Sequence, residues 1–426
     1  MTPGMPGISP DQGPPLSVPL SFFFTAPLAL IAAGALLLSG DSNQLALVHL
    51  GTVGFLLFVM LGALYQMLPV VAGAVVPMPR SAHLVHLLLL AGAGTLIAAQ
   101  ATNEASLFLV AVGSLSTALG AFLIPAGWAA ARSPMHTPTS WGMRLALLAL
   151  AAVGVAGLRL AWARGGHVFT GDWLALRLAH AHLGFVAWLG GLISAVSWQV
   201  LPMFYLVAAP PVRVTRVVLA GVAVTTVALI VAVLGVVPYS VVPWLIVPGA
   251  LVVWAVQPAW ALRALLTRKR KRKDATLWLW WVSLVMAPLC LVLGALSAWT
   301  SLEWMPRLYG VVVLWGWAGA VVHGMLMRIV PFLVWLHWCA PLVGQPGVPS
   351  ARELLPDRLV GTGAVLHVVS LGGGALGSVT GEWRLFGTGL ALTGAWLSFV
   401  LAGTVLRGKG VRPLPDPLPR GGEGGT

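Results

Sequence analysis

Residues 49–69 read HLGTVGFLLFVMLGALYQMLP and contain no Asp, Glu, Lys or Arg. An apolar run of about 20 residues is long enough to cross a bilayer as a single helix. The same pattern returns 133 residues later, at residues 182–202, where eight of the 21 positions are identical without a gap. Composition alone would give roughly two or three identities. We interpret the two stretches as copies of one transmembrane helix.

A weaker third copy lies 262 residues after the first. The matching positions in it are Gly316, Val321, Gly324, Leu326 and Pro331. The first two copies open with a histidine, His49 and His182, whereas the third has Val311 at that position with Tyr309 nearby. Successive copies are four apolar spans apart, so the pattern predicts three four-helix units. The glycines permit close helix packing, and each terminal proline kinks its helix.

The composition places the whole chain in a membrane. Charged residues make up 8% of the sequence and hydrophobic residues 58%, whereas soluble domains carry roughly 25% charged residues. Backbone polar groups in lipid must be satisfied within their own segment, and the alternating pattern of a β-barrel is absent, so the spans are helices. Cys290 and Cys339 lie far apart in apolar segments and form no CxxCH heme-attachment motif.

Twelve apolar spans follow one another with short connections, which predicts an all-α membrane protein with one integral domain at residues 20–406. The predicted spans are 20–39, 46–70, 83–101, 105–131, 142–163, 174–205, 214–237, 241–266, 276–299, 308–338, 358–380 and 384–406. Residues 1–19 and 407–426 are rich in proline and glycine, and we expect both segments to be disordered.

Charge in the connections predicts the orientation. With the N-terminus inside, the cytoplasmic side holds Arg80, Arg132, Arg213, Arg216, residues 268–273, Arg352, Arg358, Arg407, Lys409 and Arg412. The opposite side holds Asp41, Glu104, Asp172, Glu303 and Glu382. Because basic residues mark the cytoplasmic side, both termini are expected there. The basic run at 268–273 is interpreted as a topology anchor on anionic lipid headgroups, and no nucleic-acid partner is expected.

Twelve helices in three four-helix arcs, with a histidine at the outer end of the second helix, resemble the catalytic subunit I of heme-copper oxidases. The resemblance spans residues 20–406 and implies that His49 is an axial ligand of a low-spin heme and that His182 binds copper. Residues 62–69 (GALYQMLP) and 330–335 (VPFLVW) also resemble motifs in bacterial membrane proteins of the same superfamily.

The sequence departs from the oxidase pattern at the copper site. That family has adjacent histidines in the seventh helix, but residues 214–237 contain none. Its tenth helix carries two histidines separated by one residue, whereas residues 308–338 offer only His323 and His337. The copper site is therefore incomplete, and we do not expect a functional terminal oxidase.

The residues themselves make His49, His180 and His182 candidate ligands. Imidazole is a common axial ligand of heme iron. His180 and His182 lie two residues apart and point about 200° from each other on a helix, so one metal ion does not readily use both. The repeat position favours His182 facing inward. The alternative is that His49 is an interfacial residue and His182 a hydrogen-bonded packing residue.

A second set of polar residues suggests a path through the bundle. Gln66, Gln199 and Arg328 occupy one repeat position, and His323 lies deep in the tenth span. Ionisable groups inside membranes often mark pathways. The competing interpretation is that the three cap carbonyls freed by the prolines, with Arg328 reaching toward headgroups.

Three functions remain open at this point. The first is a heme- or metal-binding protein related to oxidase subunit I, which conducts electrons or handles a small gas. The second is a transporter or channel along Gln66, Gln199, Arg328 and His323. The third is a non-catalytic subunit of a respiratory complex. All three place the chain in a bacterial inner membrane, in contact with lipid and, for the first and third, with respiratory partner subunits.

Overall fold

The computed structural model describes residues 13–269 and 274–411, and in this part every regular element is helical. Within these described residues, twelve helices are long and apolar enough to cross a membrane, as the sequence predicted. The ends of the spans differ from the predicted ones by a few residues; the tenth, for example, covers Trp304–Leu342. The last helix continues to Lys409, three residues beyond the predicted end of the domain. Most of the two predicted disordered segments, and residues 270–273 of the basic run, lie outside the described residues.

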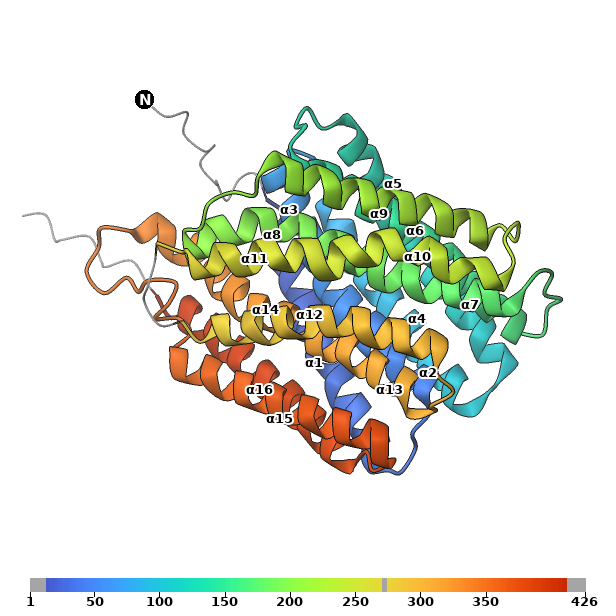
Figure 1. Ribbon diagram of the computed structural model, residues 1–426. Helices are drawn as coiled ribbons and strands as arrows, with labels where there is room; N and C mark the ends of the chain where they lie inside the picture. The colour runs from blue at the N-terminus through green and yellow to red at the C-terminus, as the bar shows by residue number, and fades with distance from the viewer. Residues whose placement is uncertain (1–12, 270–273, 412–426) are drawn as a thin grey trace, which may run out of the picture.

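Figure 1 shows the elements as a bundle of long, roughly aligned helices. Their bounds are α1 (Ser17–Leu38), α2 (Gln44–His49), η2 (Leu50–Leu57), α3 (Phe58–Ala72), η3 (Pro79–Ser81), α4 (Ala82–Thr102), α5 (Ala105–Arg132), α6 (Pro138–Arg164), α7 (Trp173–His182), η4 (Leu183–Gly190), α8 (Gly191–Tyr205), α9 (Val212–Val233), η5 (Tyr239–Val241), α10 (Val242–Leu251), η6 (Val252–Val256), α11 (Gln257–Leu266), α12 (Thr276–Trp299), α13 (Trp304–Val311), η7 (Val312–Gly319), α14 (Ala320–Val334), η8 (Trp335–Cys339), η9 (Ala340–Leu342), α15 (Asp357–Thr380) and α16 (Arg384–Lys409).

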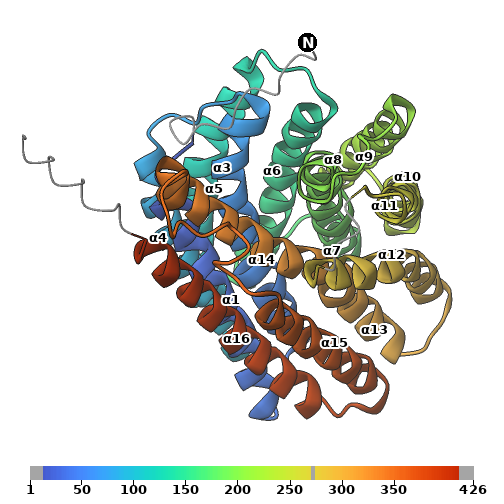
Figure 2. The ribbon, with the colours of Figure 1, turned by 90° about the vertical axis from the view of Figure 1, so that its left-hand side faces the viewer.

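The second, sixth and tenth spans are the inner helices. Their most apolar windows are 61%, 72% and 78% buried, more than in any other span that the structure describes. Viewed along the bundle in Figure 2, α14 lies in the middle, with α4, α10, α12 and α16 around it. These three spans are the ones that share the sequence pattern.

Each of the three inner spans contains an eight-residue π-helix. The segments η2, η4 and η7 begin at Leu50, Leu183 and Val312, which are 133 and 262 residues apart. These are the same offsets that align the three sequences. A π-helix has i→i+5 hydrogen bonds and is usually a single turn, often at a functional site. The wider turns change the direction in which the residues just before them point.

Close helix contacts recur at one aligned position. A Cβ atom on Gly62 would lie 2.8 Å from Phe22 Cβ, and one on Gly324 would lie 3.1 Å from Leu279 Cβ. In the sixth span the position is Ala195, whose Cβ would lie 2.4 Å from a Cβ on Gly142 of α6. The first helix of each predicted unit therefore packs against the inner helix at the same place, where one of the two residues is small.

The first and last spans also pack together. A Cβ on Gly34 of α1 would lie 2.5 Å from the carbonyl oxygen of Gly387 in α16, and one on Gly394 would lie 2.7 Å from that of Pro27. Small residues let these backbones approach closely. The contact between α1 and α16 closes the bundle into a ring.

The bundle has two ends. We call the end that holds Ser17 and Lys409 the terminal end, and the other the distal end. The distal connections carry the acidic residues named above, and the terminal connections carry most of the basic ones. His49 and His182 both lie toward the distal end, immediately before a π-helix.

Candidate functional site

Two imidazoles from different spans face each other at the distal end. The rings of His49, the last residue of α2, and His180, in α7, are nearly parallel, with an interplanar angle of 14° and a centroid distance of 6.3 Å. Both side chains are half-buried. The sequence pattern selected both residues, but it predicted His49 and His182 as the ligands, because those two share the repeat position.

The hydrogen bonds of both rings leave Nε2 free to bind a ligand. His49 Nδ1 lies 2.8 Å from the carbonyl oxygen of Leu45, and His180 Nδ1 lies 3.1 Å from that of Val153. A carbonyl oxygen only accepts, so Nδ1 carries the proton and Nε2 of the neutral ring keeps its lone pair. Metal-binding histidines almost always donate their other N–H in this way.

Gln100 and Gly157 support the two imidazoles. The side-chain amide of Gln100 lies 3.1 Å from His49 Nδ1. The atom in contact is Nε2 of the amide, and Oε1 has no partner. Turning the amide by 180° would place Oε1 at Nδ1, where it would accept the Nδ1 proton. On α6, a Cβ atom added to Gly157 would lie 2.8 Å from Cε1 of His180. Only glycine leaves room there for the ring.

His182 is engaged differently. Its Nδ1 donates to the carbonyl of Leu178 at 3.0 Å, and its Nε2 lies 3.2 Å from the hydroxyl of Tyr309. The hydroxyl therefore donates to the lone pair of His182, and a metal ion bound there would displace this hydrogen bond. The two rings are again nearly parallel, at 19° and 6.2 Å.

The two ring pairs are equivalent in the repeat. His49 and His182 occupy one aligned position, whereas His180 and Tyr309 occupy another, two residues earlier. In each pair, the residue at the repeat histidine position of one inner span meets the residue two positions earlier in the following inner span: His49 meets His180, and His182 meets Tyr309. His180 and His182 thus point to different neighbours, as expected for residues two apart on a helix.

The start of α7 is fixed by Asp172. Its carboxylate accepts hydrogen bonds from the backbone N–H groups of Leu174 and Ala175 and, across the loop, of Tyr239. The Ala175 bond contributes most to holding the pKa of Asp172 below its ordinary value. This cap sets the start of the helix that carries His180 and His182.

The polar path predicted along Gln66, Gln199, Arg328 and His323 does not coincide with the cavity at the centre of the bundle. A cavity of about 70 Å³ lies between α3, α8 and α14, and none of Gln66, Gln199, Arg328 and His323 lines it. Gln66 is buried with its Oε1 unpartnered, and Gln199 is half-buried. The path itself therefore stays a prediction.

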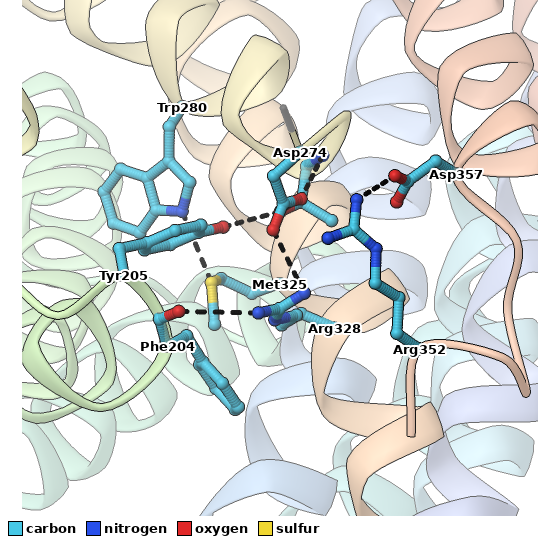
Figure 3. Close-up of polar contacts among 9 residues, drawn as sticks. Phe204, Tyr205, Asp274, Trp280, Met325, Arg328, Arg352 and Asp357 are labelled. Carbon is cyan, nitrogen blue, oxygen red and sulfur yellow. Dashed lines mark hydrogen bonds and ion pairs between the residues drawn. The ribbon is translucent and has the colours of Figure 1, made fainter. Parts of the chain in front are cut away.

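Arg328 belongs to an ion pair at the terminal end (Figure 3). Its guanidinium lies 3.1 Å from a carboxylate oxygen of Asp274, just before α12, and donates to the carbonyl of Phe204 at 3.4 Å. Asp274 also accepts from Thr276, which in turn accepts from Tyr205. The side chains of Arg328 and Asp274 are 17% and 8% exposed, so Arg328 caps α8 and pairs within the protein instead of reaching toward headgroups.

His323 forms a second imidazole pair in the interior. Both His323 and His367 are fully buried, and their Nδ1 atoms lie 3.2 Å apart. His367 Nε2 donates to the carbonyl of Trp315, so its Nδ1 accepts from His323. The Nε2 of His323 is left with a lone pair and no partner. Among the described residues, no group of three or more His, Cys, Asp or Glu side chains is placed to hold a metal ion.

Four residues that contact the candidate ligands, Arg328 or His323 could not be predicted from the sequence pattern. Gln100, Gly157, Asp274 and His367 have no counterpart in the repeat, and each acts through a contact between distant spans. Only Tyr309 stood out beforehand, by its place beside the repeat position.

A comparison with models of known protein families finds no match, and neither does a comparison with curated proteins.

Proposed function

We propose that this chain is a heme-binding membrane protein with the architecture of oxidase subunit I, in which His49 and His180 are the axial ligands of one iron. The single observation that carries the proposal is the pair of facing imidazoles, parallel within 14° at 6.3 Å. Two imidazoles that bind one metal ion from opposite sides have centroids about 6 Å apart, because each metal–nitrogen bond is about 2 Å long and each ring adds about 1 Å. The nitrogen lone pairs lie in the ring planes, so the two rings would have to meet the ion edge to edge.

The architecture in this proposal is three four-helix units around a common centre. Its supports are the shared sequence pattern, the three π-helices at the same offsets, and the equivalent ring pairs His49–His180 and His182–Tyr309. The terminal end is cytoplasmic in this proposal, since it carries most of the basic connections. The membrane is a bacterial inner membrane.

The residues present fit a heme iron. Both ligands are neutral imidazoles whose Nδ1 protons are held by carbonyl oxygens, which fixes the rings and makes Nε2 more basic. Both come from spans with a glycine two residues after the repeat histidine, Gly51 and Gly184, where a Cβ atom would meet no atom closer than 3.7 Å. An iron with two axial imidazoles supplies one-electron transfer. The protein's part is to orient the rings and exclude water from one side.

The test is the absorption spectrum and metal content of the full chain, purified in detergent after expression with sufficient heme. We expect a Soret band and about one iron per chain, both lost in His49→Ala and in His180→Ala. The matched control is His182→Ala, because His182 shares the repeat position but its Nε2 is bound by Tyr309.

The control decides between two outcomes. Retention of the Soret band in His182→Ala supports the His49–His180 pair. A wild-type protein with neither Soret absorbance nor bound iron sinks the proposal, as does a band that survives loss of His49 or His180.

A further inference from the structure

A partly open cavity lies at the centre of the bundle, and its wall follows the repeat position by position. Of the residues that line it, fifteen come from α3, α8 and α14, and they occupy five aligned positions in all three spans. The five sets are Val59, Leu192 and Val321; Met60, Ile193 and Val322; Ala63, Val196 and Met325; Leu64, Ser197 and Leu326; and Met67, Val200 and Ile329. The remaining two are Phe23 of α1 and Trp280 of α12.

The polar atoms in this wall are already engaged. Ser197 is the one hydroxyl among the lining residues; it donates to the carbonyl of Ser194 at 2.7 Å and accepts from Gln257 at 2.6 Å. The indole N–H of Trp280 donates to the sulfur of Met325. A buried water needs two to four polar partners, and this wall has none to spare. The cavity is therefore a poor site for water.

An empty cavity of this kind is also unfavourable, because its lining atoms lack partners for dispersion contacts. Its volume is about 70 Å³. An apolar cavity of about 150 Å³ in another protein stays dry and binds benzene or xenon. The space here is roughly half as large, so it suits a guest of one or two heavy atoms and excludes an aromatic ring.

We propose that this central cavity binds one small apolar gas molecule, of the class of dioxygen, nitric oxide or xenon. The site is separate from the imidazole pair, because Val59 lies ten residues beyond His49, about 15 Å along the helix. Phe23 and Trp280 reach the cavity from the outer helices α1 and α12. The proposal holds whether or not the chain binds heme.

Xenon is the probe for the test. Crystals of the full-length chain are pressurised with xenon, and the anomalous signal locates it. We expect one peak surrounded by Ala63, Val196 and Met325, which form one aligned set in the middle of the wall. A peak elsewhere in the bundle, no peak, or density of a lipid acyl chain in the cavity would overturn the proposal.

Filling the cavity provides the matched comparison. Val196→Phe and, independently, Ala63→Leu each place side-chain atoms in the space, and we expect the xenon peak to disappear in both. The control is Val224→Phe on α9, whose side chain is 56% exposed on the outside of the bundle, and it should keep the peak. Because two different positions are filled, a failure of one variant to fold still leaves the other to decide. A peak that persists in a folded, filled variant contradicts the site.

Discussion

At the scale of single residues, the candidate site depends on two residues that orient the imidazoles, Gly157 and Gln100. Gly157 leaves space for the ring of His180, and the side-chain amide of Gln100 lies against Nδ1 of His49. Orienting partners of metal-binding histidines matter because they fix the ring direction and the tautomer. The same residue type thus has different neighbours: the Nε2 lone pair of His182 accepts a hydrogen bond from Tyr309, whereas the ring of His180 lies nearly parallel to that of His49.

The first prediction concerns Gly157→Ala. The new methyl group would lie 2.8 Å from Cε1 of His180, so the ring must turn away from His49. We expect iron or heme affinity to fall about ten- to a hundredfold, the usual effect of losing an orienting contact. Titration of the apoprotein with heme, followed by the Soret band, measures it. Gly120→Ala, where a Cβ atom meets nothing within 4 Å, should bind as the wild type does. Equal affinity in both variants would refute the prediction.

At the scale of elements, the π-helices control where the imidazoles point. Each of η2 and η4 follows directly after the repeat histidine, so its wide turns set the rotation of that residue against the rest of the span. Because successive helix residues are about 100° apart, one extra or missing residue redirects every side chain before it. The inner helices therefore use an irregular segment for positioning, while most of their remaining turns pack as ordinary α-helix, apart from η8 and η9 at the end of the tenth span.

Deletion of Thr52 tests this role of η2. Removing one residue from a segment that keeps its i→i+5 hydrogen bonds rotates His49 by roughly 100° relative to the rest of the span. We expect the Soret band to be lost while the protein still assembles in the membrane. Deletion of Gly347, in the connection before α15, is the control and should leave the band intact. An unchanged spectrum after Thr52 deletion would show that η2 does not orient His49.

The ion pair between Arg328 and Asp274 joins three elements, because Arg328 also contacts the end of α8. Arg328→Met leaves the carboxylate of Asp274 buried without a counter-charge, which typically costs about 3–5 kcal/mol. We expect Asp274→Asn to be destabilising as well, and the double variant to lose much less than the sum. The measurement is a double-mutant cycle of unfolding in mixed detergent micelles. Additive losses would mean that the two charges do not interact.

At the scale of the whole molecule, three similar inner spans surround one centre, and α1 closes the ring against α16. An even number of spans puts Ser17 and Lys409 at the same end. Most of the basic connections lie at this terminal end, whereas Asp41, Glu104, Asp172, Glu303 and Glu382 lie at the distal end, and the proposed orientation rests on this charge pattern.

Cysteine labelling checks this orientation. Val168, between α6 and α7, is 90% exposed at the distal end, and Val343, before α15, is 65% exposed at the terminal end. In intact cells, a membrane-impermeant maleimide should label Val168→Cys at once and Val343→Cys only after permeabilisation. The native Cys290 and Cys339 are buried, so they contribute little background. The reverse labelling order would invert the proposed topology.

The sequence alone determined the number of spans, their approximate ends and the shared pattern of the inner three, since these depend on apolar length and on spacing along one chain. It also selected His49, His180 and His182. Only the tertiary structure decided that His49 faces His180, that Tyr309 occupies His182, and that Arg328 pairs with Asp274. Those contacts depend on how separate helices rotate against each other, and the rotation is set by π-helical turns and close glycine contacts that the apolar pattern of a single span does not encode.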